Sequence, residues 1–176
     1  SEERRKEWAR VKEKEEKDRK QRYAERDRRN RGKKPVPREL MAKANELSDK
    51  SEQAKQQGNM AGAEKLLKEA LQMNPDHGLT LLRWALLLER LQRYQDATRE
   101  YEKALEAGSP ALFDRQRLVA QNNLGLMYKE QMNRHDKAEV VWKDAIADME
   151  KARVNNFHFP YRNLGQMFEK NSRTYE

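Results

Sequence analysis

The residues that could carry chemistry in this sequence are few and widely separated. There are three histidines, His77, His135 and His158, and no cysteine. A metal site on a helix needs ligands three or four residues apart, or carboxylates that converge with them. The histidines have no such spacing, and the lack of thiols excludes a disulfide framework, a thiolate metal site and a thiol nucleophile. We therefore expect no metal site and interpret the histidines as turn or loop residues.

Pairs of carboxylates occur but do not indicate catalysis. Glu100 with Glu102 and Asp144 with Asp148 lie in segments that also carry Lys and Arg. General acid–base chemistry requires a desolvated pocket that shifts a pKa, whereas a mixed-charge helix face is normally solvated. A glycine-rich phosphate loop is also missing from the sequence. We predict that the protein is not an enzyme and takes no cofactor and no small-molecule substrate.

Charge divides the chain near residue 34. Residues 1–34 contain 16 Lys and Arg against 9 Asp and Glu, so they hold a net +7 of the total +8. Opposite charges recur there at helical spacing, as in Glu16 and Lys20, which supports an exposed helix. Pro35-Val36-Pro37 then ends it, because proline cannot continue a helix. We predict a basic helical arm over 1–34, a proline linker over 35–37 and a second domain over 38–176.

The hydropathy pattern excludes two targeting classes. No apolar stretch is long enough to span a bilayer, and the first residues lack a signal-peptide core. We expect a soluble intracellular protein without membrane insertion, in the cytoplasm, the nucleus or an organelle matrix.

One pattern of small and large residues recurs three times after residue 38. Each copy has alanine, a large apolar residue four positions later, and alanine three positions after that. The copies are Ala63, Leu67 and Ala70, then Ala97, Tyr101 and Ala104, then Ala138, Trp142 and Ala145. These spacings mark one face of a helix that a neighbouring helix approaches closely at each alanine.

A second pattern pairs with the first. The segment Asn123-Leu124-Gly125-Leu126-Met127-Tyr128 returns forty residues later as Asn163-Leu164-Gly165-Gln166-Met167-Phe168. Leucine and the aromatic residue share a helix face, and the glycine between them admits a partner helix. Recurrence of two helices at a period of 34 to 40 residues is typical of helical repeat arrays.

These residues resemble the tetratricopeptide repeat family over about residues 38–176. The resemblance rests on Gly58, Ala63, Leu67, Ala70 and Pro75, on Trp84, Leu88, Tyr94, Ala97, Tyr101 and Ala104, on Leu124, Gly125, Tyr128, Ala138, Trp142 and Ala145, and on Tyr161, Leu164, Gly165 and Phe168. It implies an all-α, right-handed superhelix of helical hairpins. The units are expected at about 44–77, 78–111 and 118–152, with only the first helix of a fourth at 158–176.

The sequence departs from the family pattern at four places. Lys50, Ser51 and Ala54 replace the usual residues in the first helix, and the third unit has one extra residue in its turn. Glu150 replaces the closing proline, so that helix should run on toward Ala152. The long segment 110–122 should extend the following helix backward. The fourth unit ends after one helix, so 161–170 should present an unpaired face that a continuation or a partner would cover.

The first helices of the units line the concave groove in this family. By resemblance, the groove would present Leu79, Leu82, Arg83, Leu86, Arg90, Asn122, Asn123, Leu126, Lys129, Arg162, Asn163, Gln166 and Lys170. Asn123 and Asn163 occupy equivalent places, and an amide side chain suits an extended peptide backbone because it both donates and accepts. Plain surface polarity is the alternative interpretation of these asparagines.

One known family function does not fit the residues. Members that grip the C-terminal carboxylates of heat-shock chaperones use lysine, asparagine and arginine at five groove positions. Here those positions hold Ser48 and Glu52, Arg83, and Val119 and Asn123. We therefore expect a different partner.

Three interpretations remain open for the arm. It is a solvated charged helix or tail, it binds an acidic protein surface, or it binds a phosphate backbone. The anchoring residues would be Trp8, Arg26, Arg28, Arg29, Arg31, Lys33 and Lys34. Nine interleaved acids weaken the case for nucleic acid.

The sequence favours a non-catalytic protein–protein interaction scaffold or adaptor subunit of a multi-subunit assembly. It would bind a partner protein in the groove and anchor through the basic arm. The alternative is an RNA-associated subunit of a ribosome-like particle, whose RNA affinity would fall steeply with added salt. A regulatory subunit of an enzyme is a third possibility.

Overall fold

The computed structural model describes residues 1–108 and 111–173, and every regular element in that part of the chain is helical. The chain divides into two compact units, Ser1–Lys34 and Pro35–Glu176. The predicted all-α class is therefore confirmed.

The first unit is the single helix α1, Glu2–Arg31. None of its residues is buried, as the low content of apolar residues requires. Ion pairs at a spacing of four residues run along it, with Lys6 Nζ 2.7 Å from Glu2 Oε1 and Lys20 Nζ 2.6 Å from Glu16 Oε1. Such pairs support an isolated helix by a few tenths of a kcal/mol each. The charged helix expected from the sequence is present.

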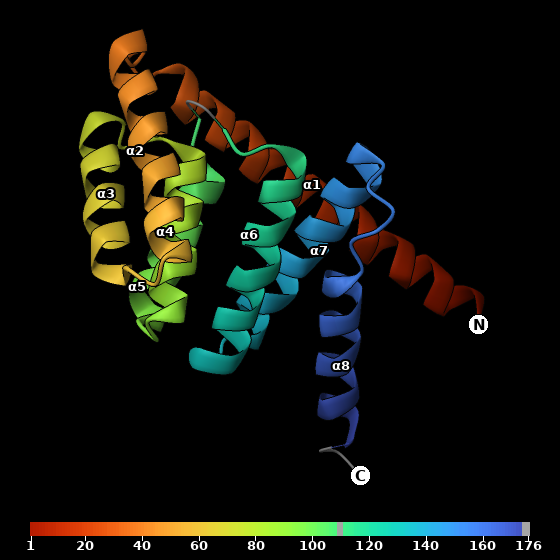
Figure 1. The fold of residues 1–176 in the computed structure, drawn as a ribbon. Helices are drawn as coiled ribbons and strands as arrows, with labels where there is room; N and C mark the ends of the chain where they lie inside the picture. The colour runs from red at the N-terminus through yellow and green to blue at the C-terminus, as the bar shows by residue number, and fades with distance from the viewer. Residues whose placement is uncertain (109–110, 174–176) are drawn as a thin grey trace. The chain divides into compact units, whose positions relative to one another are not determined.

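The second unit is a series of helical hairpins (Figure 1). Its helices are α2 (Arg38–Gln56), α3 (Met60–Met73), α4 (Gly78–Arg90), α5 (Tyr94–Glu106), α6 (Asp114–Leu126), α7 (His135–Ala152) and α8 (Phe159–Arg173). Helices α2 and α3, α4 and α5, and α6 and α7 form the three hairpins, and α8 packs against α6 and α7. This is the predicted arrangement of three units and the first helix of a fourth.

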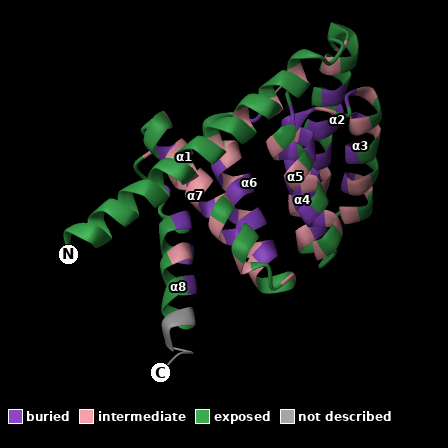
Figure 2. Cartoon of the chain, turned by 180° about the vertical axis from the view of Figure 1, so that it is seen from behind, coloured by how far each residue is buried: buried purple, intermediate pink, exposed green. Residues whose placement is uncertain are grey.

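The repeated alanines form the contacts between these helices. All six that the sequence singled out, Ala63, Ala70, Ala97, Ala104, Ala138 and Ala145, are at most 1% exposed. Figure 2 shows the buried residues as bands along the facing sides of the helices. Tight helix approach at these positions, predicted from their spacing, is confirmed.

Each hairpin turn contains one residue in the left-handed backbone region. Gly58, Gln92 and Asn133 have φ of 80°, 59° and 51° respectively. Glycine adopts this region without a steric cost, whereas Gln92 and Asn133 are held there by the helices on either side. In the first turn the side chain of Asn59 then caps α3 by accepting from the amide of Gly62 at 2.8 Å.

The extra residue of the third unit is absorbed by a π turn. After α6 the chain forms η1, Met127–Gln131, in which the amide of Met132 donates to the carbonyl of Met127 at 3.2 Å. A bond to the fifth preceding residue accommodates one more residue than an α-turn. The sequence predicted the extra residue in the turn, and the structure places it at the end of the helix before the turn.

Two other departures from the repeat pattern appear as expected, and two helices begin before the approximate bounds of their units. Helix α7 runs to Ala152, and α6 begins at Asp114 rather than at 118 because its N-terminus extends backward. The first hairpin likewise begins at Arg38, earlier than 44. Ser109 and Pro110, which belong to the long junction, lie outside the described residues.

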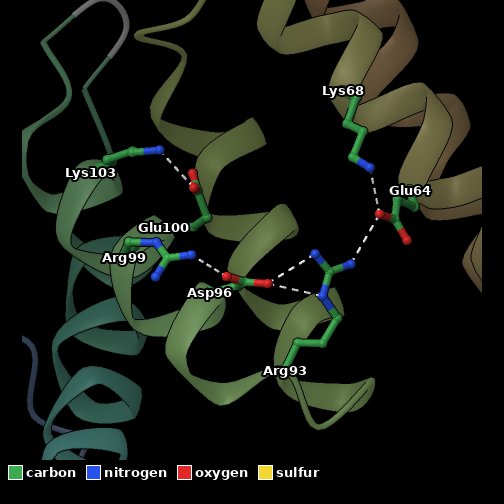
Figure 3. Close-up of polar contacts among 7 residues, drawn as sticks. All are labelled: Glu64, Lys68, Arg93, Asp96, Arg99, Glu100 and Lys103. Atoms are coloured by element: carbon green, nitrogen blue, oxygen red, sulfur yellow. Dashed lines mark hydrogen bonds and ion pairs between the residues drawn. The ribbon is translucent and has the colours of Figure 1, made fainter.

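Charged residues link the first hairpin to the second on the surface (Figure 3). Arg93, just before α5, lies 3.1 Å from Glu64 Oε1 on α3 and 2.9 Å from Asp96 Oδ2. Lys68 Nζ is 2.7 Å from the same Glu64 oxygen, and its hydrogen bond is the main cause that lowers the pKa of Glu64. Each exposed pair contributes little alone, so this network mainly orients the neighbouring hairpins.

Candidate protein-binding surface

The first helices of the hairpins form the inner layer of the stack. Contacts run directly from α2 to α4, from α4 to α6 and from α6 to α8, whereas α3, α5 and α7 mainly contact helices of that layer. A layer whose members touch one another is on the shorter, inner side of a curved stack. The exposed face of α4, α6 and α8 is therefore the candidate binding surface, which we call the inner face.

Helix α4 supplies a continuous stripe to the inner face. Leu79, Arg83, Leu86 and Arg90 follow one another at steps of four, three and four residues, which places them on one side of the helix. The two leucines and Arg83 are half-buried and Arg90 is exposed. The stripe thus combines partly accessible apolar surface with positive charge.

Helices α6 and α8 continue this surface. Leu126 is half-buried at the end of α6, Lys129 is half-buried in the following η1, and Arg162, Gln166 and Lys170 are exposed on α8. Lys129 Nζ lies 2.9 Å from Glu130 Oε1. All nine of these positions on α4, α6, η1 and α8 were proposed from the sequence as groove residues.

Three other proposed groove residues are buried and do not line a free surface. Leu82 belongs to the hydrophobic core, and Asn122 and Asn163 are less than a tenth exposed. Leu82 is next to the α4 stripe but faces the other hairpin helices. Asn163 Nδ2 donates to Asn122 Oδ1 at 2.9 Å, which holds α8 on α6.

The asparagines form a chain of hydrogen bonds across four helices. Asn122 Nδ2 donates to Asn123 Oδ1 at 3.3 Å, and Asn123 Nδ2 donates to the hydroxyl of Tyr101 at 3.0 Å. That hydroxyl donates in turn to Glu89 Oε2 at 2.5 Å. With Asn163 as the first donor, the chain runs from α8 through α6 and α5 to α4. Successive bonds of one direction polarise and strengthen one another.

Tyr101 connects the asparagines to Glu89 in this series of hydrogen bonds. Burial raises the pKa of its hydroxyl far above the usual range, and the hydrogen bond to Glu89 raises it further. The hydroxyl therefore stays protonated and keeps donating to the carboxylate. The asparagines consequently belong to the framework that fixes the inner face, and each of their amide nitrogens already donates one hydrogen bond within it. Sequence periodicity placed Tyr101 in the core but gave no signal of its bond to Glu89.

Arg83 bridges the first two units at the inner face. Its Nη1 lies 2.8 Å from both Ser48 Oγ and Asp49 Oδ1 on α2. A guanidinium that bonds a hydroxyl and a carboxylate on another helix is fixed in orientation. Arg83 therefore presents its remaining donors at a defined place on the surface.

His77 is a structural histidine at the start of α4. Its Nδ1 accepts from the amide of Thr80 at 3.2 Å and lies 2.7 Å from the Thr80 hydroxyl. The other nitrogen, Nε2, is 2.6 Å from Asn45 Oδ1 on α2. The ring must be neutral, with its proton on Nε2, to serve as both the helix cap and a donor to Asn45. Burial is the main cause that lowers its pKa, and Arg83 lowers it further against a smaller opposing effect of Asp49.

Stability should depend on this histidine below neutral pH. Because the pKa of His77 is lower in the folded chain than its ordinary 6.5, protonation favours the unfolded chain. We expect the urea midpoint to be constant above about pH 6.5 and to fall as the pH drops below that value. His77→Asn keeps a capping oxygen but cannot titrate, so its midpoint should fall less over the same range. An identical pH profile for both proteins would contradict this role.

The arm residues proposed for anchoring are mostly exposed. Trp8 is exposed with Lys12 Nζ 4.7 Å above its ring, and Arg28, Arg29, Arg31, Lys33 and Lys34 are exposed as well. Arg26 differs, because it is half-buried, stacks on Tyr23 and pairs with Asp27 at 2.9 Å.

Two features are absent from the part of the chain that the structure describes, a metal-binding cluster and a membrane-spanning helix. Residues 1–108 and 111–173 contain no cluster of three or more His, Asp or Glu side chains that could hold a metal ion. Within the same ranges, no helix is long and apolar enough to cross a bilayer.

Known proteins of the same fold were found by comparison. The family model for the tetratricopeptide repeat matches residues 76–151. The structure is similar to the TPR domain of Arabidopsis OM64, with a TM-score of 0.58 and 17% identity over 73% of this chain and 98% of that one. It is similar also to the Sgt2 TPR domain from Aspergillus fumigatus, with a TM-score of 0.61 and 17% identity over 81% and 86% of the two chains. A search of the curated proteins found no match.

These matches agree with the geometry of the hairpins. The sequence match covers the second and third hairpins, and the structural matches extend over most of the helical stack. A tetratricopeptide repeat domain is a protein–protein interaction module. Residues 76–151 therefore match the tetratricopeptide repeat, and the helical stack has the fold of TPR domains.

Proposed function

We propose that this chain is a non-catalytic adaptor subunit that holds a segment of another protein against its inner face. The observation that carries the proposal is the row of half-buried leucines on that face, Leu79 and Leu86 on α4 and Leu126 on α6. Partly exposed apolar side chains in a row, bordered by charged ones, are typical of surfaces that bind proteins.

The charges beside these leucines indicate the chemistry of the bound segment. Arg83, Arg90, Lys129, Arg162 and Lys170 all lie on the inner face. Cations around an apolar strip favour a segment that alternates apolar side chains with carboxylates, since the carboxylates steer the encounter and fix its register. The bound segment should therefore be acidic and amphipathic.

The arm would serve as a second attachment point. A helix of 30 residues is about 45 Å long at 1.5 Å per residue. Helix α1 has no hydrophobic core of its own, so packing contributes little to its stability. Its exposed Trp8 and its basic residues suit an acidic protein surface. Two linked attachment points raise the overall affinity beyond that of either one.

Introducing negative charge on the inner face tests the proposal. Leu86→Glu with Leu126→Glu places two carboxylates in the apolar row, so partner binding should fall by about tenfold or more, which corresponds to about 1.4 kcal/mol. Partner binding is measured by pulldown from the source extract, and its affinity by titrating the chain into that extract. Val140→Glu on α7 is the matched control, because Val140 is exposed away from the inner layer. Equal binding by the double variant and the control would contradict the proposal.

A further inference from the structure

The first hairpin meets the second differently at its two ends. At one end, Ala63 and Leu67 of α3 belong to the main hydrophobic core, together with residues of α4 and α5. At the other end, Ala44, Leu47 and Ala70 form a small apolar cluster within the first hairpin that is separate from the main core. The main core therefore joins the two hairpins at only one of these ends.

Polar contacts join α2 to α4 at the end where the separate cluster lies. Asn45 Oδ1 is 2.6 Å from Nε2 of His77, and Arg83 Nη1 is 2.8 Å from both Ser48 Oγ and Asp49 Oδ1. Ser48 and His77 are both buried. Buried polar groups are costly unless they keep their hydrogen-bond partners, so this end of the junction depends on these few bonds.

His77 is the member of this junction that ordinarily changes charge between pH 5 and pH 8. The neutral ring accepts from the amide of Thr80 at Nδ1 and donates from Nε2 to Asn45. Protonation adds a hydrogen to Nδ1, so the Thr80 amide loses its acceptor. The ring also becomes a buried cation, which is costly unless a carboxylate faces it.

The charged groups near His77 do not favour a buried cation. Arg83 on α4 opposes it, and Asp49 on α2 is already paired with Arg83 at 2.8 Å. Asp76, beside His77 in the turn, accepts from the amide of Gly108 at 3.0 Å. Residues 70–75, at the end of α3 and in the turn, carry no charge. Burial is the largest of these effects, and together they lower the pKa of His77 below its ordinary 6.5.

We propose that acid opens this end of the junction, so that the first hairpin separates from α4 while the later hairpins stay folded. Helices α2 and α3 contact each other more extensively than either contacts α4, so the hairpin moves as one body. The apolar contacts of Ala63 and Leu67 remain and act as the hinge.

The size of the effect is bounded by the exposed ring. At about pH 5, a histidine with the ordinary pKa of 6.5 is protonated over neutral by about thirty to one. Since the closed junction disfavours the proton, acid raises the ratio of open to closed chains by up to about thirtyfold.

Opening also changes the inner face. Ser48 and Asp49 move away with the hairpin, so Arg83 loses the two bonds that fix its orientation. A surface whose guanidinium is no longer held in place binds less tightly, because the bound segment must then order it. A partner is therefore released in acid, and this consequence rests on the proposed function.

The test uses the full chain, whose lack of cysteine allows labels to be placed at chosen positions. Spin labels at Ala42→Cys on α2 and Gln95→Cys on α5 report the junction, and labels at Gln95→Cys and Val140→Cys on α7 report the later hairpins. All three positions are exposed. Double electron–electron resonance is recorded at about pH 7.5 and about pH 5.

We expect the distances between positions 42 and 95 to lengthen and broaden in acid, and those between 95 and 140 to stay the same. An unchanged first pair would overturn the proposal. Equal changes in both pairs would overturn it as well, because they would mean that the whole stack unfolds.

Two variants assign the response to His77. Asn45→Asp places a carboxylate opposite Nε2, so it stabilises the protonated ring and should keep the junction closed at about pH 5. His135→Asn with His158→Asn removes the other two histidines and should leave the response unchanged. Opening of Asn45→Asp equal to that of the wild type, or loss of the response in the second variant, would overturn the role of His77.

Pulldown from the source extract separates the switch from the proposed function. Partner recovery should fall between about pH 7.5 and about pH 5 for the wild type, and less for Asn45→Asp. Equal falls for both proteins would overturn acid release. If no partner is recovered at the higher pH while the labels report opening, the proposed function is contradicted and the switch is supported.

Discussion

Trp142→Ala is expected to destabilise the chain by about 3 to 5 kcal/mol, the range for truncating a fully buried tryptophan. The indole is 0% exposed and fills the space over Gly125. Its removal leaves a cavity that Gly125 cannot fill, because glycine has no side chain. The carbonyl of Asn122 also loses its hydrogen bond to Nε1. Urea unfolding followed by circular dichroism measures the change.

Trp142→Phe provides the matched comparison. Phenylalanine keeps most of the apolar volume but lacks the N–H donor, so its cost should be clearly smaller than that of alanine. A cost below about 1 kcal/mol for Trp142→Ala would mean that the α6–α7 interface is not packed as described.

The two equivalent glycines should respond to alanine with opposite signs. Gly125→Ala places a methyl group 2.2 Å from a buried indole that has no room to move, so it should destabilise the chain by about 1 to 3 kcal/mol. Gly165→Ala adds a methyl group to open space and should stabilise the helix by about 0.5 to 1 kcal/mol.

This pair is informative because the two substitutions are chemically identical. Helix propensity favours alanine at both positions, so the difference in sign reports only what lies over each glycine. Both variants are measured by urea unfolding under one set of conditions. Changes of the same sign would contradict the view that Gly125 is covered by Trp142 while Gly165 faces open space.

The repeat pattern predicted most of the hairpin packing. The spacing of Ala97, Tyr101 and Ala104 defined one helix face, and a face with small residues at its edges must be approached closely by a neighbour. Gly125 was likewise expected to admit a partner helix, and the structure shows that this helix is α7. Periodicity is sufficient here because the repeated units bury equivalent faces against one another.

The polar contacts could not be predicted in this way. Periodicity places Asn123 and Asn163 on equivalent helix faces, but it does not fix the axial offset between neighbouring helices. Because of the offset that the structure has, Asn163 reaches Asn122 and Asn123 reaches Tyr101. The residues proposed to bind a peptide therefore include some that hold the helices of the stack together.

The π turn is a similar case. Counting residues from Leu124 to Ala138 reveals one more than in the second unit, but the count does not locate it. The structure locates it at Met127–Gln131, where Tyr128 is buried and its hydroxyl bonds Glu102 on α5.

Binding at the inner face is the central claim, and a photo-crosslinking amino acid at position 126 tests it most directly. The same amino acid at position 140 on α7 serves as the reference, and adducts formed in the source extract are mapped by mass spectrometry. We expect position 126, and not position 140, to capture one acidic, amphipathic segment of a partner protein reproducibly. Equal capture at both positions, or capture of no defined segment at 126, would contradict binding at the inner face.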